Sequence, residues 1–161
     1  MPLQTAVLPS PVGLLALDCD GSALTAVHLR VSGPPREPSG PVLQRAAREL
    51  EEYFAGRRRT FSVPLRRPPS ATAFQHLVWD ELLRIPFGET RTYGELARAL
   101  GTAARAVGGA CGRNALPLFI PCHRVVAKAG LGGFSGDWES GLALDVKRVL
   151  LEHEACACGS T

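Results

Sequence analysis

The chain lacks any long apolar stretch, although 45% of its 161 residues are hydrophobic. A helix that spans a membrane needs roughly 18 or more consecutive apolar residues, so we expect no membrane segment. The first residues, MPLQTAVLPSPVG, have neither the basic start nor the long apolar core of a secretory signal peptide. We therefore expect an intracellular protein, cytoplasmic or, in a eukaryote, nuclear. Its apolar content suffices for one domain or two small ones.

The chain lacks a cysteine pattern typical of metal sites or of a disulfide framework. No Cys-x-x-Cys pair is present, whereas such a pair marks most structural zinc sites. An odd number of cysteines in a chain of this size favours reduced thiols. We expect no metal, and we interpret the last two cysteines as part of a frayed C-terminal tail. The five cysteines are Cys19, Cys111, Cys122, Cys156 and Cys158.

Lysine is also nearly absent, since the chain contains only Lys128 and Lys147 and has a formal net charge of +3. Acids are rare between residues 91 and 128, where Glu95 is the only one. Such an arginine-rich stretch can contact the phosphates of a nucleic acid. A solvated basic surface is the alternative, and charge alone leaves both open. The glycine-rich residues 130–136 lack both a phosphate-loop lysine and the strand-to-helix context of a dinucleotide site.

The first part of the chain predicts a small α/β domain. Residues 12–17 and 24–29 are apolar runs around an Asp20-Gly21 pair, which predicts a hairpin. Apolar residues recur on one helical face over residues 42–55, and Gly56 is placed to end that helix. Phe61, Val63 and Leu65 alternate like a strand. A proline-rich linker over 66–70 then separates a domain at 1–69 from one at 70–161.

The second part predicts mainly helices. Thr72-x-x-Gln75 is a capping box before apolar residues at helical spacing. Thr92-x-x-Glu95 is a second capping box, before a helix over 93–100. Gly101 is placed to end that helix. Thr102 can cap a further helix over 103–111, and a final helix is predicted from about 141 to 153.

A helix, a three-residue turn and a second helix form the outline of a helix-turn-helix. The second of these helices consists almost entirely of small residues. Small residues let a helix approach another surface closely, either a neighbouring helix or a nucleic-acid groove. Arg105 is its one large polar side chain in the first turn, and a protein core does not explain it.

The stretch IPCHRV over residues 120–125 places a thiol beside an imidazole. Neighbouring side chains on a strand point to opposite faces, and Pro121 removes a backbone donor, so we predict an irregular turn there. A free cysteine thiol ordinarily has a pKa of about 8.5, so it needs a base or a positive setting to act as a nucleophile. His123 could be that base, and a buried, inert Cys122 is the alternative. The acid that orients His123 could be any of Asp137, Glu139, Asp145, Glu152 and Glu154.

From Ala73 to Glu154 the chain carries, in this order, FQ at 74–75, VW at 78–79, PFGET at 86–90 with Tyr93, ARAVGGA at 104–110, GRN at 112–114, LPLFIPCHRVV at 116–126 and LLEHE at 150–154. This order of motifs resembles the signature of the O6-alkylguanine-DNA alkyltransferases, also called methylated-DNA–protein-cysteine methyltransferases. The N-terminal part resembles the family's α/β domain more loosely. The resemblance implies a small ribonuclease-H-like sheet with a helix, followed by a mainly α-helical domain with a helix-turn-helix.

The resemblance implies a single-turnover DNA repair reaction that needs no cofactor. Cys122 would accept the alkyl group of O6-alkylguanine and, less efficiently, of O4-methylthymine. His123 would take the thiol proton through a water, and Glu154 would orient His123. Asn114 would hold the turn by hydrogen bonds. Tyr93 would donate a proton or hydrogen bond to N3 of the departing guanine.

The resemblance also implies how DNA is held. Arg105 would fill the gap left by a flipped nucleotide, because a thiolate cannot reach O6 while the base is stacked. The small helix would enter the minor groove. We expect a monomer that acts on double-stranded DNA containing alkylated guanine. Base contacts are assigned to Val125, Phe134, Ser135 and Gly136. DNA contacts are assigned to Thr92, Ala103, Ala104, Arg105, Ala106, Gly108, Arg113 and Arg124.

The chain departs from the family pattern in a few places. It is slightly shorter between Tyr93 and Arg105, has Ala115 where proline is common and Phe134 where tyrosine is frequent, and carries an apparent insertion over 137–140. Two alternative functions stay open. A lesion sensor of the alkyltransferase-like class would bind without transfer, but Cys122 speaks against it. A helix-turn-helix regulator without chemistry would leave the Cys-His pair unexplained.

Overall fold

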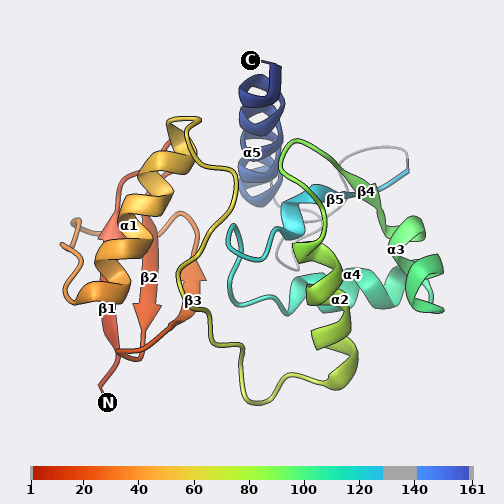
Figure 1. Ribbon diagram of the computed structural model, residues 1–161, viewed down its shortest axis with the longest axis horizontal. Helices are drawn as coiled ribbons and strands as arrows, with labels where there is room; N and C mark the ends of the chain where they lie inside the picture. Colours follow the sequence, from red (N-terminus) through yellow and green to blue (C-terminus); the bar gives the residue numbers. More distant parts are fainter. Residues whose placement is uncertain (1, 129–140, 160–161) are drawn as a thin grey trace. The chain divides into compact units, whose positions relative to one another are not determined.

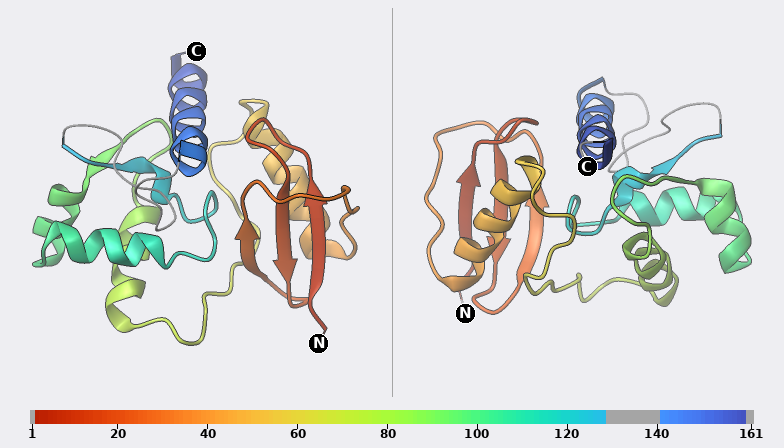
Figure 2. Two further views of the ribbon diagram at one scale, coloured as in Figure 1. Left: turned by 180° about the vertical axis from the view of Figure 1, so that it is seen from behind. Right: turned by 45° about the horizontal axis from the view of Figure 1, so that its top comes forward.

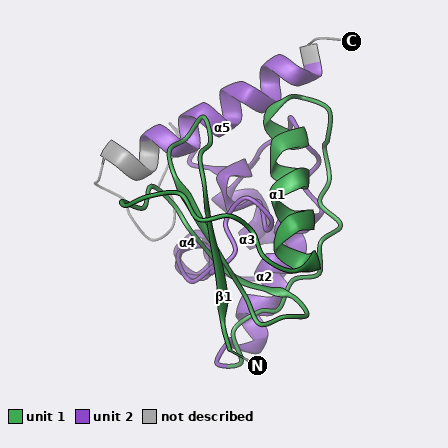
Figure 3. Cartoon of the chain, turned by 90° about the vertical axis from the view of Figure 1, so that its left-hand side faces the viewer, with its two compact units in different colours: residues 1–69 green, residues 70–161 purple. Residues whose placement is uncertain are grey.

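The chain divides into two compact units, residues 1–69 and 70–161, which Figure 3 distinguishes by colour. The computed structural model describes residues 2–128 and 141–159. The first unit is a small sheet with one helix, and the second consists mainly of helices (Figures 1 and 2). This order confirms the predicted fold class. No helix in the described part of the chain is long and apolar enough to cross a membrane.

The sheet of the first unit is antiparallel, with the order β1-β2-β3. β1 spans Gln4–Leu8, β2 spans Leu15–Cys19 and β3 spans Leu24–His28. The β2–β3 hairpin confirms the prediction, and the Asp20 carboxylate closes its turn by accepting from the amides of Ser22 and Ala23. β1 was not predicted, because its sequence, QTAVL, does not alternate between polar and apolar residues and only Ala6 is buried.

Helix α1, Pro41–Phe54, lies across one face of this sheet (Figure 1). Its buried residues include Leu43, Ala46 and Leu50, which the sequence pattern had placed on the apolar face. Tyr53 and Glu49 are buried there as well. Gly56 follows the helix with a φ of 78°, a left-handed conformation that glycine adopts without strain.

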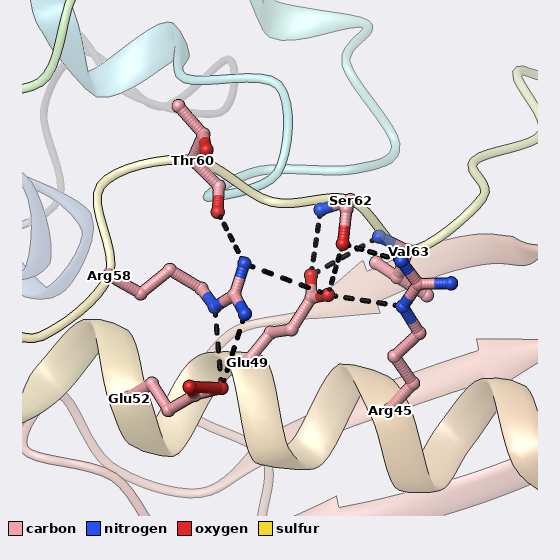
Figure 4. A network of polar contacts seen from close by, with 7 residues as sticks. All are labelled: Arg45, Glu49, Glu52, Arg58, Thr60, Ser62 and Val63. Carbon is pink, nitrogen blue, oxygen red and sulfur yellow. Dashed lines mark hydrogen bonds and ion pairs between the residues drawn. The ribbon is translucent and has the colours of Figure 1, made fainter.

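The strand predicted over Phe61–Leu65 is wrong, because residues 61–65 form only an isolated bridge between Leu65 and Leu24. The buried Glu49 carboxylate accepts hydrogen bonds from the amides of Ser62 at 2.8 Å and Val63 at 3.2 Å (Figure 4). These amides are therefore not available to a strand partner. Pro64 has no amide hydrogen at all, which further prevents a ladder.

The second unit packs its helices around buried aromatic and aliphatic side chains. It contains α2 (Ala73–Leu83), α3 (Tyr93–Leu100), α4 (Ala104–Gly112) and α5 (Gly141–Gly159). A short parallel pair joins β4 (Arg91–Thr92) to β5 (Val125–Val126), and the 3-10 turn η1 spans Cys122–Arg124. The indole N–H of the buried Trp79 donates to the carbonyl of Ala110 at 2.9 Å, which ties α2 to α4.

The predicted helix starts and stops are largely correct. Thr72 and Gln75 form the complete capping box of α2. Thr92 Oγ1 accepts from the amide of Glu95 at 3.0 Å, which is the first half of the second predicted box. Gly101 ends α3 in the left-handed conformation. The prediction that Thr102 caps α4 is wrong, since Ala103 occupies the N-cap and offers no side-chain acceptor.

Helix α5 is longer than predicted, because it continues to Gly159 instead of ending near His153. The interpretation of Cys156 and Cys158 as a frayed tail is therefore wrong. The thiol of Cys158 lies 3.6 Å from the carbonyl oxygen of Phe87, so the last turn of the helix packs against the residues that follow α2.

Candidate active site

Cys122 lies in the predicted irregular turn. Pro121 has φ −81° and ψ 66°, and the Cys122 amide donates to the Ile120 carbonyl at 2.8 Å, which is the geometry of an inverse γ-turn. The 3-10 turn η1 follows at once. Cys122 is only 3% exposed, so a reacting group has to be brought to the thiol. We call residues 120–124 the Cys122 turn.

Asn114 connects this turn to the end of α4. Its side-chain amide donates to the Ile120 carbonyl at 2.8 Å, and its side-chain oxygen accepts from the Leu116 amide at 2.9 Å. Its own backbone amide donates to the Cys111 carbonyl at 3.2 Å. The Ile120 carbonyl thus receives both Asn114 and Cys122. The buried Asn114 holds the backbone on which the thiol is mounted.

His123 is fully buried and pairs with Glu154 through a 2.7 Å contact between Nε2 and Oε2. Since an ionised carboxylate only accepts, Nε2 carries the hydrogen and Nδ1 is the basic nitrogen. Within the described residues, Nδ1 has no hydrogen-bond partner. Burial lowers the pKa of His123, and the charges of Arg124 and Lys147 reinforce this against the opposing effect of Glu154. The ring is therefore neutral and able to take a proton.

Glu154 is the acid that the geometry selects from the five candidates. Asp145 and Glu152 are exposed, while Asp137 and Glu139 lie outside the described residues. Burial by itself would raise the pKa of Glu154, but hydrogen bonds from His123 and Arg124, together with the charge of Arg124, hold that pKa well below its ordinary value. Glu154 is thus a buried carboxylate that stays ionised.

Arg124 was predicted to contact DNA, and that prediction is wrong. The residue is buried, and its guanidinium donates to both oxygens of Glu154, from Nε at 2.9 Å and from Nη2 at 3.1 Å. Nη1 donates to the Ile85 carbonyl at 2.7 Å. The ring of Phe87 lies 5.8 Å from the guanidinium carbon. A guanidinium so fully bonded inside the unit is unavailable to a phosphate.

Lys147 belongs to the site and was missed by the sequence reasoning. It is fully buried, and its Nζ donates to the Val125 carbonyl at 2.6 Å. Burial lowers the pKa of Lys147 to about 8, although the negative charge of a thiolate at Cys122 would favour its ammonium form. Charge interaction is mutual, so Lys147 favours a thiolate at Cys122. The available signal was its scarcity and its spacing of i, i+7 before Glu154 on one helix.

Tyr93 and Cys111 lie near the same charges. Tyr93 is buried at the start of α3, with Lys147 Nζ 5.6 Å from its ring centre. Burial raises the pKa of Tyr93 well above its ordinary value, and a negative charge at Cys122 adds to this effect. Burial likewise raises the pKa of Cys111 to about 12. Tyr93 therefore remains a phenol that can donate, and Cys111 remains an unreactive thiol.

The residues predicted to face DNA separate into exposed and buried groups. Ala103, Ala104 and Arg105 are exposed at the start of α4, Arg113 is exposed after it, and Ala106 and Thr92 are half-buried. Gly108 is buried, so its assignment to the DNA face is wrong; Gly109 is the exposed glycine, with open space beside it. Phe134, Ser135 and Gly136 lie outside the described residues, and Val125 is buried.

No group of three or more His, Cys, Asp or Glu side chains that could hold a metal ion occurs within residues 2–128 and 141–159. The described site instead consists of the Cys122 thiol, the neutral His123 ring and the Tyr93 phenol. The buried charges of Arg124, Lys147 and Glu154 lie beside them. Such a set suits nucleophilic attack by sulfur, with the thiol proton passing to an internal base.

The chain matches known proteins over nearly its whole length. Residues 73–156 match the family described as 6-O-methylguanine DNA methyltransferase, DNA binding domain, and residues 3–67 match its ribonuclease-like domain. A methylated-DNA–protein-cysteine methyltransferase of Methanosarcina acetivorans is 41% identical over 157 residues, 92% of this chain and 96% of that protein. The constitutive Bacillus subtilis enzyme is 52% identical over 117 residues, 71% of this chain and 67% of that protein.

Comparison with solved structures supports the same family. Mycobacterium tuberculosis O6-methylguanine methyltransferase superposes with a TM-score of 0.83 at 36% identity, covering 99% of this chain and 97% of that one. A structure of Mycobacterium tuberculosis OGT in complex with DNA has a TM-score of 0.78 at 40% identity, with coverages of 94% and 92%. The chain therefore belongs to the 6-O-methylguanine DNA methyltransferase family.

Proposed function

We propose that this protein repairs alkylated DNA by moving the alkyl group of O6-alkylguanine onto Cys122, once per molecule. The observation that carries the proposal is the buried arrangement behind the thiol. A neutral His123 bonded to an ionised Glu154 can take a proton, and Lys147 favours the thiolate. Membership of the methyltransferase family supplies the substrate class.

The proposed reaction is a direct displacement. The Cys122 thiol proton passes to His123, and the sulfur attacks the alkyl carbon as the bond from that carbon to O6 breaks. The bonding electrons leave with the guanine, and Tyr93 donates a hydrogen bond or proton to N3, which lowers the charge on the leaving base. The product is S-alkylcysteine. Nothing in this sequence of steps restores the thiol, so the reaction is stoichiometric.

Docking on DNA is assigned to α4 and the residues beside it. Ala103, Ala104 and Arg105 are exposed on its first turn, and Gly109 is exposed one turn beyond Arg105. Small side chains permit close approach to the minor groove, and Arg105 is long enough to occupy the space of a flipped base. We propose that the protein acts as a monomer in the compartment that holds the DNA, the cytoplasm or, in a eukaryote, the nucleus.

Mass spectrometry tests the proposal. Incubation with a duplex oligonucleotide carrying O6-methylguanine should add one methyl group per protein molecule, and peptide mapping should place it on Cys122. Cys122→Ser should keep its DNA affinity and gain no methyl group. Lesion binding by the wild type without any mass change would identify a sensor and contradict the proposal.

The role of Arg105 can be measured separately. Arg105→Ala should slow transfer from O6-methylguanine in duplex DNA more than transfer from free O6-benzylguanine, because only the duplex requires a base to be flipped. Single-turnover rates with the two substrates give the comparison. Equal slowing with both substrates would contradict the flipping role.

A further inference from the structure

We propose that Arg124 is a positioning residue of the active site, which holds Glu154 toward His123 and balances its charge so that His123 rests in the neutral form. This inference rests on the proposed function, since it concerns the base that takes the Cys122 proton. Arg124 is one residue from His123 and was expected on the DNA surface; its interior position calls for another role.

The contacts define how Glu154 is held. Oε2 accepts from His123 Nε2 at 2.7 Å and from Arg124 Nη2 at 3.1 Å. Oε1 accepts from Arg124 Nε at 2.9 Å and from the Gly88 amide at 3.2 Å. The two-pronged contact from one planar guanidinium fixes the plane of the carboxylate. The carboxylate therefore presents one oxygen to His123 in a fixed direction.

Arg124 is itself immobilised. Nη1 donates to the Ile85 carbonyl at 2.7 Å, and the guanidinium lies over the ring of Phe87. Gly88, next to Phe87, approaches α5 so closely that a Cβ there would lie 2.3 Å from the thiol sulfur of Cys158. Residues 85–88 thus contact Arg124 through the Ile85 carbonyl and the Phe87 ring, and they contact Glu154 through the Gly88 amide.

The charges around His123 explain why the arginine matters for proton transfer. Glu154 favours the imidazolium, whereas Arg124 and Lys147 oppose it. A lone buried carboxylate would hold a proton on the ring before the thiol could deliver one. Because Arg124 balances the charge of Glu154, Nδ1 of His123 stays unprotonated and can accept the thiol proton.

Three variants test the role. Arg124→Met removes charge and hydrogen bonds at similar length, and Arg124→Lys keeps the charge but not the two-pronged contact. Arg84→Met is the matched control, because it removes an exposed arginine that pairs with Glu81. Three measurements apply to each folded variant: the protonation of His123 by 15N-histidine NMR against pH, the single-turnover methyl-transfer rate, and affinity for undamaged duplex DNA.

We expect Arg124→Met to protonate His123 at higher pH than the wild type does and to slow methyl transfer at least tenfold. Arg124→Lys should leave the His123 titration nearer to wild type yet still slow transfer, because the carboxylate is no longer held in one plane. DNA affinity should stay unchanged in both. The control should match the wild type in all three measurements.

An unchanged His123 titration in Arg124→Met, or a wild-type rate in Arg124→Lys, would overturn the proposal. Weaker DNA binding with a normal rate on free O6-benzylguanine would return Arg124 to the DNA surface and also overturn it. If Arg124→Met does not fold, the lysine variant decides by its rate. If the wild type transfers no methyl group, the proposed function fails, while the histidine titrations still decide the role of Arg124.

Discussion

At the scale of single residues, buried ionisable side chains gather at the Cys122 turn and its hydrogen-bond partners. Arg124 and Lys147 are cations, Glu154 is an anion and His123 is neutral, and all four are buried. Within the described residues, this cluster therefore holds one more positive than negative charge. A thiolate at Cys122 would balance it. Because buried charges interact in a low-dielectric setting, the excess positive charge favours the ionised nucleophile.

The Lys147 ammonium should therefore set the alkaline limit of the reaction. Its pKa is lowered to about 8, so the wild-type transfer rate should decline as pH rises through that value. Lys147→Met should slow transfer at pH 7 by about tenfold or more and should remove this alkaline decline, since each 1.4 kcal/mol lost from the transition state is about tenfold. Single-turnover rates from pH 6 to 9 provide the measurement. A persisting decline near pH 8 in Lys147→Met would show that another group titrates there.

At the scale of elements, α4 has one face in the protein and one face outside it. Val107, Gly108, Ala110 and Cys111 are buried, whereas Arg105 and Gly109 are exposed and four residues apart on one face. The sequence showed that the helix is small but not which glycine faces outward. Burial decides this, because α4 packs against both α2 and α3.

The substitution Gly109→Ala should change protein stability and DNA affinity in opposite directions. The added Cβ meets nothing within 4 Å, and alanine is the better helix former, so the free energy of unfolding should rise by up to about 1 kcal/mol. If the exposed face lies close to DNA, duplex affinity should fall despite this gain. Gly94→Ala in α3 is the matched control and should gain stability without losing affinity. Thermal unfolding and duplex titration are the measurements; unchanged affinity in Gly109→Ala would place the close contact elsewhere.

In the first unit, Glu49 and its hydrogen-bond partners hold residues 61–65 in an irregular conformation instead of a strand. Glu49 accepts from two backbone amides and from the Ser62 hydroxyl at 2.6 Å, and Arg45 and Arg58 pair with it (Figure 4). Glu49→Ala should leave the buried Val63 amide unpaired, which costs about 1–3 kcal/mol. Hydrogen exchange should accelerate in peptides covering 57–63. Unchanged protection there would mean that other contacts hold the segment.

At the scale of the whole molecule, each unit carries a buried carboxylate that should make its stability depend on acid. Burial opposes ionisation of Glu49 and Glu154, but hydrogen bonds outweigh it and hold the pKa of each below the ordinary value. A lowered folded-state pKa contributes stability that is present above the unfolded pKa and is lost as pH falls through the folded one. Both units should therefore weaken below about pH 4.5.

Tryptophan fluorescence isolates the second unit, because Trp79 and Trp138 both lie within residues 70–161. Denaturant unfolding followed by this signal should show stability falling from pH 5 to pH 3. Glu49→Gln should leave that fluorescence-detected dependence unchanged, since Glu49 belongs to the first unit. Stability that is constant over this range would contradict the ionised state assigned to Glu154.

The sequence by itself determined the elements whose signals are local. A capping box at Thr72, a left-handed glycine at 101 and an Asp-Gly turn act through residues a few positions away, so they can be recognised without a fold. The Cys-His pair, the turn at Pro121 and the family resemblance were also contained in the order of residues. These local signals were sufficient to predict the fold class and the candidate nucleophile.

Only the tertiary structure decided which polar side chains turn inward. Arg124 meets Glu154 across 30 residues and Gly88 meets it across 66, and no local pattern encodes these distances. No local pattern predicts that Lys147 is buried, that Glu49 keeps residues 61–65 from forming a strand, or which face of α4 is exposed. A charged side chain is buried only where the fold supplies partners for it, and those partners come from distant parts of the chain.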